Sequence, residues 1–351
     1  MKHKLVFIGF GVVGQGLAEI LRDKKEALRQ KEGFEPLIVG IADLMKGSIY
    51  HPDGLDIDTA LQVLERTGNL EHYPSTTGLV TSWDSFKMIR ESNADTIIEV
   101  SYTDVKTGQP AIDHCKAAFT SGKNVVMTNK GPVALAYNEL SKIAEENGVQ
   151  WGFEGTVMSG TPALRMPVTS LAGNTITEIR GIFNGTTNFI LTKMEEEGAS
   201  YEEALSEAQK LGYAEADPTS DVEGYDARYK IVILANHVMN IPLTVEEVSC
   251  KGITDILKDI EEAKGEGKRW KLLAKLQNEK GKVLASVAPE RVEVTDPLAS
   301  INGATNAITY ECDLLGPVTL SGAGAGKVET GFSLLIDLIN IHREKKLVNI
   351  Q

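Results

Sequence analysis

The stretch KLVFIGFGVVGQG, residues 4–16, decides the fold of the first part of the chain. Residues 4–8 are mostly aliphatic or aromatic and predict a short buried strand. Gly9, Gly11 and Gly14 follow directly and lead into a helix-like segment. In this spacing the first glycine allows a tight turn, the second lets the backbone approach a pyrophosphate, and the third lets the helix pack close to the strand. The stretch therefore predicts a dinucleotide-binding turn.

Strand-like and helix-like segments alternate beyond this turn. Strands are predicted at residues 36–43, 94–101, 123–129 and 149–155, and helices at residues 17–33, 57–66, 110–122 and 135–148. Residues 44–79 are less regular apart from their one short helix. Such alternation predicts an α/β fold, with a parallel sheet covered by helices on both faces.

Two further features of this region concern the expected dinucleotide. Val12 and Val13 would offer free N–H groups at the helix start to the phosphates. Asp43 ends the second strand, where an acidic residue binds the ribose 2′-hydroxyl of NAD. It lies further from the glycines than is usual, and the alternative is a simple turn aspartate. The pattern favours NAD, because Asp43 would repel a 2′-phosphate, while the nearby Lys46 leaves NADP open.

The second half of the chain differs from the first half in its pattern of sequence segments. The lysine-rich segment 255–277 is amphipathic, and strands are expected at residues 270–278 and 282–292. A glycine-rich stretch with Gly322, Gly324 and Gly326 precedes a final helix at residues 332–342; it is either a flexible loop or a return to the first domain. The length of 351 residues fits two domains. We expect a dinucleotide-binding domain at 1–135 with 318–343, and a second domain at 136–317.

Composition narrows the classes of function. The formal net charge is −13, with no lysine or arginine cluster, which argues against a nucleic-acid partner. Three widely separated cysteines predict neither disulfides nor structural zinc, and favour a reducing, cytoplasmic location. No stretch is long and apolar enough to span a membrane, and the N-terminus reads as a strand rather than a signal peptide.

Three polar segments are candidates for chemistry. VVMTNKGPVA places Lys130 just after a strand, where parallel sheets present ligand-binding groups, although an exposed lysine would look the same. GIFNGTTNFI, residues 181–190, offers hydroxyl and amide donors, or is an ordinary capped turn. GYAEADPTSDVEGYDARYK, residues 212–230, ends with Asp226 and Lys230 four residues apart, on one helix face. Its alternative is a solvated acidic loop with one surface ion pair.

In this order, GFGVVGQG, TNKGPVA, FNGTTNFIL and GYAEADPTSDVEGYDARYK resemble homoserine dehydrogenase. The resemblance spans nearly the whole chain. It implies a Rossmann-type dinucleotide-binding domain plus a second α/β catalytic and dimerisation domain, in a homodimer. The implied reaction is NAD(P)-dependent interconversion of L-aspartate 4-semialdehyde and L-homoserine, in threonine and methionine biosynthesis. Many members carry a C-terminal regulatory domain, which we do not expect here.

The resemblance also implies roles for single residues. Lys230 would donate or accept the proton at the carbonyl oxygen, and Lys130 beside it would contact cofactor and substrate. Glu215 and Asp226 would hold the substrate, mainly by its ammonium group, with Asp221 in support. Partial desolvation of such a lysine would bring its pKa toward the working pH.

Further implied sites concern the cofactor and an ion. Ser101 would face the nicotinamide, and Gly326 would touch the cofactor. The family places a monovalent cation, often sodium, on a loop such as FEGTVMSGT. Its oxygen ligands would come, partly through the backbone, from Glu154, Val157, Ser159 and Thr161.

Two rival functions remain open from the sequence. A phosphorylating semialdehyde dehydrogenase would need a cysteine nucleophile, and Cys115, Cys250 and Cys312 lack an evident activating environment. A nucleotide-binding sensor would bind the cofactor without turnover. It would leave the acid-and-lysine segment without a purpose.

Overall fold

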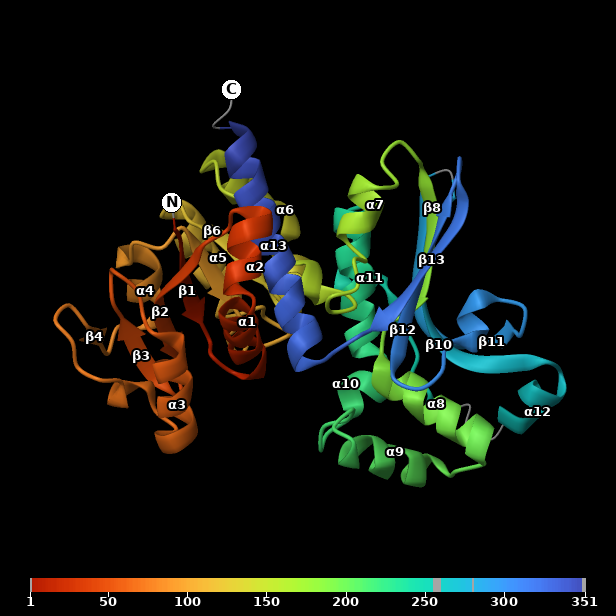
Figure 1. Cartoon of the computed structure of the whole chain (residues 1–351). Coiled ribbons are helices and arrows are strands. Elements are labelled where there is room, and N and C mark those ends of the chain that lie inside the picture. Colours follow the sequence, from red (N-terminus) through yellow and green to blue (C-terminus); the bar gives the residue numbers. More distant parts are fainter. Residues whose placement is uncertain (1, 255–259, 280, 349–351) are drawn as a thin grey trace. The chain divides into compact units, whose positions relative to one another are not determined.

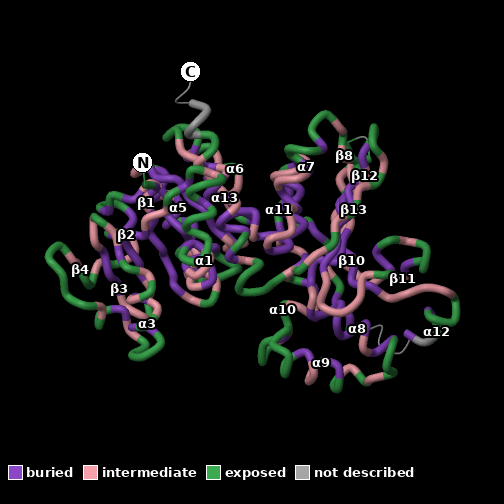
Figure 2. Tube along the Cα trace, in the orientation of Figure 1, coloured by how far each residue is buried: buried purple, intermediate pink, exposed green. Residues whose placement is uncertain are grey.

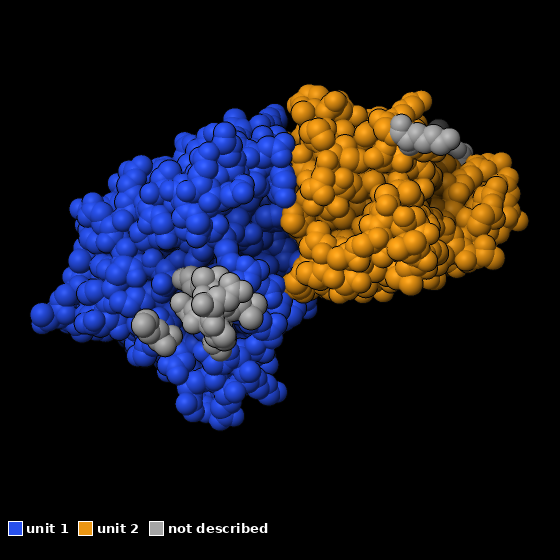
Figure 3. Space-filling model, turned by 90° about the horizontal axis from the view of Figure 1, so that it is seen from above, with its two compact units in different colours: residues 1–156, 326–351 blue, residues 157–325 orange. Residues whose placement is uncertain are grey.

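The computed structural model describes residues 2–254, 260–279 and 281–348. The chain forms two compact units, residues 1–156 with 326–351, and residues 157–325 (Figure 3). The first unit thus runs further than the expected boundary at 135, because the chain continues through a helix into one more strand of the first sheet. The expected return near 318 comes at 326 instead, because residues 316–323 pair within the second sheet.

The first unit is built on a seven-stranded sheet with the order β4-β3-β2-β1-β5-β6-β7 (Figure 1). The strands from β2 to β7 in this order run parallel, whereas β3 and β4 are antiparallel additions at one edge. The strands are β1 (His3–Ile8), β2 (Pro36–Asp43), β3 (Gly47–Tyr50), β4 (Val80–Thr81), β5 (Thr96–Glu99), β6 (Asn124–Met127) and β7 (Trp151–Gly152). The parallel α/β prediction is confirmed. Strand β3 was missed inside the irregular stretch 44–79, and β4 was missed directly after it.

Helices of the first unit connect these strands. They are α1 (Val12–Asp23), α2 (Lys25–Glu32), α3 (Ile57–Thr67), α4 (Ser85–Glu91), α5 (Ala111–Thr120), α6 (Lys130–Glu146) and α13 (Lys327–Val348), with short 3-10 turns η1 (Leu70–His72) and η2 (Glu154–Thr156). The last helix returns to α1, and a Cβ atom on Gly16 would lie 2.5 Å from the Lys327 carbonyl oxygen. Glycine at this position therefore allows α1 and α13 to cross closely.

Helix α6 begins earlier than predicted. The strand expected to reach Asn129 ends at Met127, and Lys130 is the first residue of α6, where a start at 135 was expected. Pro132 lies in the first turn of α6, where a proline loses no hydrogen bond. Lys130 therefore lies at a helix N-terminus directly after a strand.

The second unit is built on a six-stranded sheet with the order β13-β12-β8-β10-β11-β9. The strands are β8 (Ile176–Ile182), β9 (Ser249–Cys250), β10 (Lys268–Glu279), β11 (Lys282–Glu293), β12 (Thr305–Cys312) and β13 (Gly316–Ala323). The predicted pair at 270–278 and 282–292 is confirmed as the antiparallel β10 and β11. Part of the expected amphipathic segment, residues 255–259, lies outside the described residues.

Helices α8 and α11 both pack against the second sheet (Figure 1). The helices of this unit are α7 (Arg165–Thr169), α8 (Gly185–Glu197), α9 (Tyr201–Lys210), α10 (Thr219–Val222), α11 (Tyr225–His237) and α12 (Ile260–Gly265), with 3-10 turns η3 (Val245–Glu247) and η5 (Pro297–Ser300). Along α11, residues 230–236 are all buried, as expected for an apolar helix packed on a sheet. This helix carries the lysine of the acidic segment.

Burial follows the two sheets (Figure 2). In β1, Leu5, Val6 and Phe7 are fully buried, as in a parallel strand covered on both faces. In the second unit the core side of the sheet includes Ile179, Ile308 and fully buried Tyr310. Within the described residues, no helix is long and apolar enough to cross a membrane.

Candidate functional site

The glycine turn of the first unit has the geometry of a dinucleotide cradle. Gly9 has φ +89°, and a Cβ atom there would lie 2.4 Å from the Val100 carbonyl oxygen. A Cβ atom on Gly14 would lie 3.1 Å from the Gly9 carbonyl oxygen, whereas Gly11 faces open space. Among the described residues, no side chain caps the N-terminus of α1, which Gly11 precedes. The first helical turn, with Val12 and Val13, therefore presents its N–H groups beside the open space at Gly11.

Asp43 organises the neighbouring loop. One carboxylate oxygen accepts the Phe10 N–H at 2.7 Å, and the other accepts the N–H groups of Met45 at 2.9 Å and Lys46 at 3.0 Å. The Lys46 ammonium lies 3.8 Å from the same carboxylate. An ionised carboxylate has about four acceptor positions. Asp43 thus links β1 to the end of β2 and keeps capacity for a further donor such as a ribose hydroxyl.

Ser101 and Lys130 follow the carboxyl ends of β5 and β6, which are neighbours in the first sheet. Asn129, which precedes α6, donates from its side-chain amide to the Ser101 carbonyl oxygen at 3.0 Å. The same amide and the Ser101 hydroxyl both donate to Glu99, the last residue of β5. Two segments that the sequence singled out are therefore joined at one end of the sheet.

Gly326 occupies the N-terminus of α13 in the first unit. Its φ is +133°, and the Thr330 N–H donates to its carbonyl oxygen at 2.9 Å. A φ of +133° is strained for any residue with a Cβ atom, so the position favours glycine. This turn begins the helix that crosses α1.

The acidic segment of the second unit forms a buried polar cluster. Lys230 on α11 donates from Nζ to Asp226 Oδ2 at 2.6 Å and to the Phe183 carbonyl oxygen at 2.6 Å. Asn184, which caps α8, donates from Nδ2 to Asp221 Oδ1 at 2.6 Å and to Asp226 Oδ2 at 3.2 Å. Lys230 is only 6% exposed. The reading of a solvated acidic loop with a surface ion pair is therefore wrong for these residues.

Electrostatics differ between the two aspartates of the cluster. Burial raises the pKa of the Asp221 carboxyl, the Asn184 amide opposes this effect, and the charge of Asp226 adds to it. Asp226 lies in the first turn of α11, where the helix dipole favours a negative charge. The cluster can therefore combine a buried ammonium with one paired and one weakly acidic carboxyl.

Other sequence-predicted residues lie outside this cluster. Glu215 is exposed, and its backbone carbonyl oxygen accepts a bond from Gln209. The candidate cation residues are divided between the units, since Glu154 belongs to the first and Val157, Ser159 and Thr161 to the second. Glu154 is buried, and its N–H donates to Asp337 at 3.0 Å. Within the described residues, no group of three or more His, Cys, Asp or Glu side chains could hold a metal ion.

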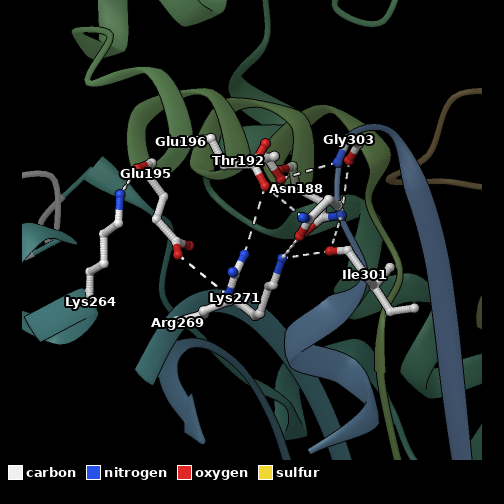
Figure 4. A network of polar contacts seen from close by, with 10 residues as sticks. Asn188, Thr192, Glu195, Glu196, Lys264, Arg269, Lys271, Ile301 and Gly303 are labelled. Atoms are coloured by element: carbon white, nitrogen blue, oxygen red, sulfur yellow. Dashed lines mark hydrogen bonds and ion pairs between the residues drawn. The ribbon is translucent and has the colours of Figure 1, made fainter. Parts of the chain in front are cut away.

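The sequence reasoning missed a second buried lysine. Lys271 on β10 is 1% exposed and donates to Asn188 Oδ1 at 3.1 Å, to the Ile301 carbonyl oxygen at 2.5 Å and to Asn302 Oδ1 at 3.4 Å. In Figure 4 the side chains of Lys271 and Asn188 point toward one another. Burial lowers the pKa of Lys271 to about 8. The pattern of β10 gave no clear signal, because residues 271–274 are all buried and Lys271 shares its strand face with the polar Lys275.

The cysteines offer no activated nucleophile among the described residues. Cys115 and Cys312 are buried, Cys250 is partly buried, and all three are free. Burial raises the pKa of each thiol, most strongly for Cys115. A phosphorylating dehydrogenase needs a thiolate, so this rival function loses its support.

Comparison with known proteins gives a consistent family. The model of the homoserine dehydrogenase family matches residues 162–339. An NAD+-dependent homoserine dehydrogenase of Pseudomonas canavaninivorans is 45% identical over 344 residues, 97% of each chain. The chain belongs to the homoserine dehydrogenase family.

Solved structures agree with this membership of the homoserine dehydrogenase family. The crystal structure of a putative homoserine dehydrogenase from Archaeoglobus fulgidus superimposes with a TM-score of 0.87 at 37% identity, covering 97% of this chain and 99% of that one. A hyperthermophilic archaeal homoserine dehydrogenase in complex with NADPH has a TM-score of 0.82 at 31% identity and 98% coverage of both chains. The α/β fold with a nucleotide-binding and a catalytic domain, predicted from the sequence, is confirmed.

Proposed function

We propose that this chain catalyses the NAD(P)-dependent interconversion of L-homoserine and L-aspartate 4-semialdehyde. The observation that carries the proposal is the buried cluster of Asn184, Asp221, Asp226 and Lys230, formed by two of the segments that carry the resemblance. A solvated acidic loop would not hold a lysine at 6% exposure. A nucleotide sensor would have no use for such a cluster.

The first unit fits a dinucleotide, because Gly9 and Gly14 let the backbone pack tightly at the turn and Gly11 faces open space at an uncapped helix end. When bound, the cofactor supplies or accepts the hydride. Lys230 then binds the substrate oxygen and exchanges a proton with it. Asp226 holds the Lys230 ammonium group in position. Lys130, at the start of α6, contacts cofactor and substrate.

The acidic residues have different proposed roles in binding the substrate. Asp226 and Glu215 bind the substrate ammonium, and Asp221 supports Asp226 through their shared partner Asn184. Because the Glu215 carboxylate is exposed, we assign it the smaller share of ammonium binding. Ser101 and Gly326 complete the cofactor contacts in the first unit.

NAD is the proposed preferred cofactor. Asp43 lies at the end of β2 with an acceptor position to spare, and its charge opposes a 2′-phosphate. Replacement Asp43→Ser should lower the ratio of kcat/KM with NAD to kcat/KM with NADP, on the order of tenfold, in steady-state assays. An unchanged ratio would remove Asp43 from cofactor selection.

A monovalent cation, sodium by the resemblance, is proposed for the loop at residues 154–161. Support comes from the backbone, because Met158 and Ser159 both have positive φ, 57° and 53°. Such strain in consecutive non-glycine residues clusters at ligand-binding sites. Thermal unfolding in sodium chloride against choline chloride tests this, and an equal midpoint would contradict the ion.

A homodimer in the cytoplasm is the proposed state of the enzyme. One face of the second sheet carries half-buried polar residues, among them Arg180 and Lys275, which pair with Asp296 and Glu290. We assign the dimer contact to this unit. Light scattering on the purified chain tests it, and a monomer mass would contradict it.

The function is tested by oxidation of L-homoserine with NAD and NADP in parallel, followed by absorbance of the reduced nicotinamide. Homoserine-dependent reduction with a preference for NAD is the expected result. Cofactor binding without turnover of homoserine would overturn the substrate assignment while leaving the dinucleotide-binding unit intact.

A further inference from the structure

A fully buried carboxylate lies at the carboxyl end of β5 and has no role in the chemistry described above. Glu99 is 0% exposed. Its Oε1 accepts the Ser101 hydroxyl and faces His114 Nδ1 at 3.1 Å, and its Oε2 accepts the Asn129 side-chain amide. Leaving a buried carboxylate unsatisfied would be costly, so all three donors are needed.

These donors come from three separate segments. Ser101 follows β5, Asn129 precedes α6 and its Lys130, and His114 belongs to α5. The Asn129 amide also donates to the Ser101 carbonyl oxygen at 3.0 Å. Glu99 therefore fixes the two strand ends that carry the nicotinamide-side residues of the proposed function.

His114, on α5, contacts the Glu99 carboxylate and is itself held in place by a further contact. It is 3% exposed, and its Nε2 lies 2.9 Å from the Ser85 hydroxyl at the start of α4. Because the carboxylate accepts at Oε1, His114 must carry a proton on Nδ1 and donate it toward Glu99.

We propose that Glu99 is a positioning residue for the nicotinamide cofactor, acting through Ser101 and Asn129. This inference depends on the proposed function in one respect, the identity of the cofactor as a nicotinamide dinucleotide. A glutamine of the same shape would place an NH2 group against donors that need an acceptor. Ser101 and Asn129 would then lose their fixed orientation, whereas the substrate cluster of the second unit would keep its own contacts.

The test is Glu99→Gln in the full-length chain. Binding of NADH is measured by fluorescence titration, and KM is measured for both cofactor and L-homoserine. We expect Kd for NADH and KM for the cofactor to rise on the order of tenfold, while KM for homoserine stays within about twofold. A purely structural role would lower the melting temperature or the active fraction without this split between the two KM values.

A matched control is Glu195→Gln, which alters a buried carboxylate of the second unit that pairs with Arg269 at 3.5 Å. It should leave the Kd for NADH unchanged. An unchanged Kd for NADH in Glu99→Gln, or an equal rise in the control, would overturn the proposal.

A second variant keeps the proposal testable if Glu99→Gln does not fold. Asn129→Ala removes the donor on the other side, and it should raise the Kd for NADH by a similar factor. In the double variant the two effects should not add, because both act through one contact. A wild-type Kd in Asn129→Ala would also overturn the proposal. If the wild-type protein binds NADH but leaves homoserine unoxidised, the proposed substrate fails, and the binding comparison still decides the role of Glu99.

Discussion

Two lysines of the second unit are buried to a similar extent and have opposite surroundings. Lys230 is 6% exposed and pairs with the Asp226 carboxylate. Lys271 is 1% exposed, and its hydrogen-bond partners are neutral oxygens of Asn188, Ile301 and Asn302. A carboxylate partner offsets much of the free energy that an ammonium group loses when it is removed from water. Neutral acceptors offset less of this desolvation cost.

The difference separates a chemical role from a structural one. Lys230 shares its cluster with acids that can hold a cationic substrate, and it lies in the family's most particular segment. Lys271 instead joins β10 to α8 and to the loop before β12, through Asn188, which also donates to the Gly303 and Thr305 carbonyl oxygens (Figure 4). We therefore expect loss of Lys230 to slow turnover strongly, and loss of Lys271 to change stability and its pH dependence.

The largest effect is expected from Lys230→Met. Without a group to exchange the proton at the substrate oxygen, kcat should fall about a thousandfold. Binding of NADH should be unchanged, because the glycine turn belongs to the first unit. Steady-state kinetics with a fluorescence titration of NADH measure both. Retained turnover would remove Lys230 from the mechanism.

Lys271→Met should keep turnover within a few-fold and change how stability depends on pH. The pKa of Lys271 is lowered from 10.5 to about 8 in the folded protein. Between these two pH values, the unfolded chain therefore carries more protons at Lys271 than the folded chain does. Wild-type stability therefore rises with pH through this window, relative to the variant, by up to about 3 kcal/mol. Urea unfolding of both proteins at several pH values gives the difference. If the difference in free energy of unfolding between the two proteins stayed constant from about pH 8 to 10.5, Lys271 would not have the lowered pKa that its burial implies.

Asp221→Asn sharpens the description of the acidic cluster. Burial raises the pKa of Asp221, so the wild-type cluster should lose its second negative charge on acidification earlier than an ordinary aspartate would. The variant should lower kcat/KM for homoserine on the order of tenfold at neutral pH and should move the acid limb of the pH profile. If the acid limb stays in place, another group sets it.

Glu215→Gln should have the smallest effect. Its carboxylate is exposed, and exposed charge pairs contribute little. KM for homoserine should rise less than about fivefold, with kcat unchanged. A loss comparable to that of Lys230→Met would mean that Glu215 joins the buried cluster during turnover.

Motifs with a fixed local geometry could be predicted from the sequence. The turn with Gly9, Gly11 and Gly14 needs only a strand before it and a helix after it, and the spacing of Asp226 and Lys230 is set by one helical turn. The parallel sheet followed from the alternation of strand and helix. The turn and the helical spacing depend on contacts within a few residues of one another, and the sheet prediction depends on the order of local segments.

Long-range contacts could not be predicted in the same way. Asn184 meets Asp221 across 37 residues, and Lys271 meets Asn188 across 83. The short edge strands β3 and β4 depend on pairing with β2 rather than on their own pattern. The place of Glu99 also went unnoticed, because IIEVS reads as a strand whether or not its acid is satisfied.

The most direct test of the central claim uses L-homoserine that carries deuterium on C4, the carbon bearing the hydroxyl. The wild-type protein is incubated with NAD+, and the reduced cofactor is examined by mass spectrometry. The account predicts that one deuterium moves to the nicotinamide, and that Lys230→Met forms the same labelled product about a thousandfold more slowly. Reduced cofactor without deuterium, or a variant as fast as the wild type, would contradict direct hydride transfer assisted by Lys230.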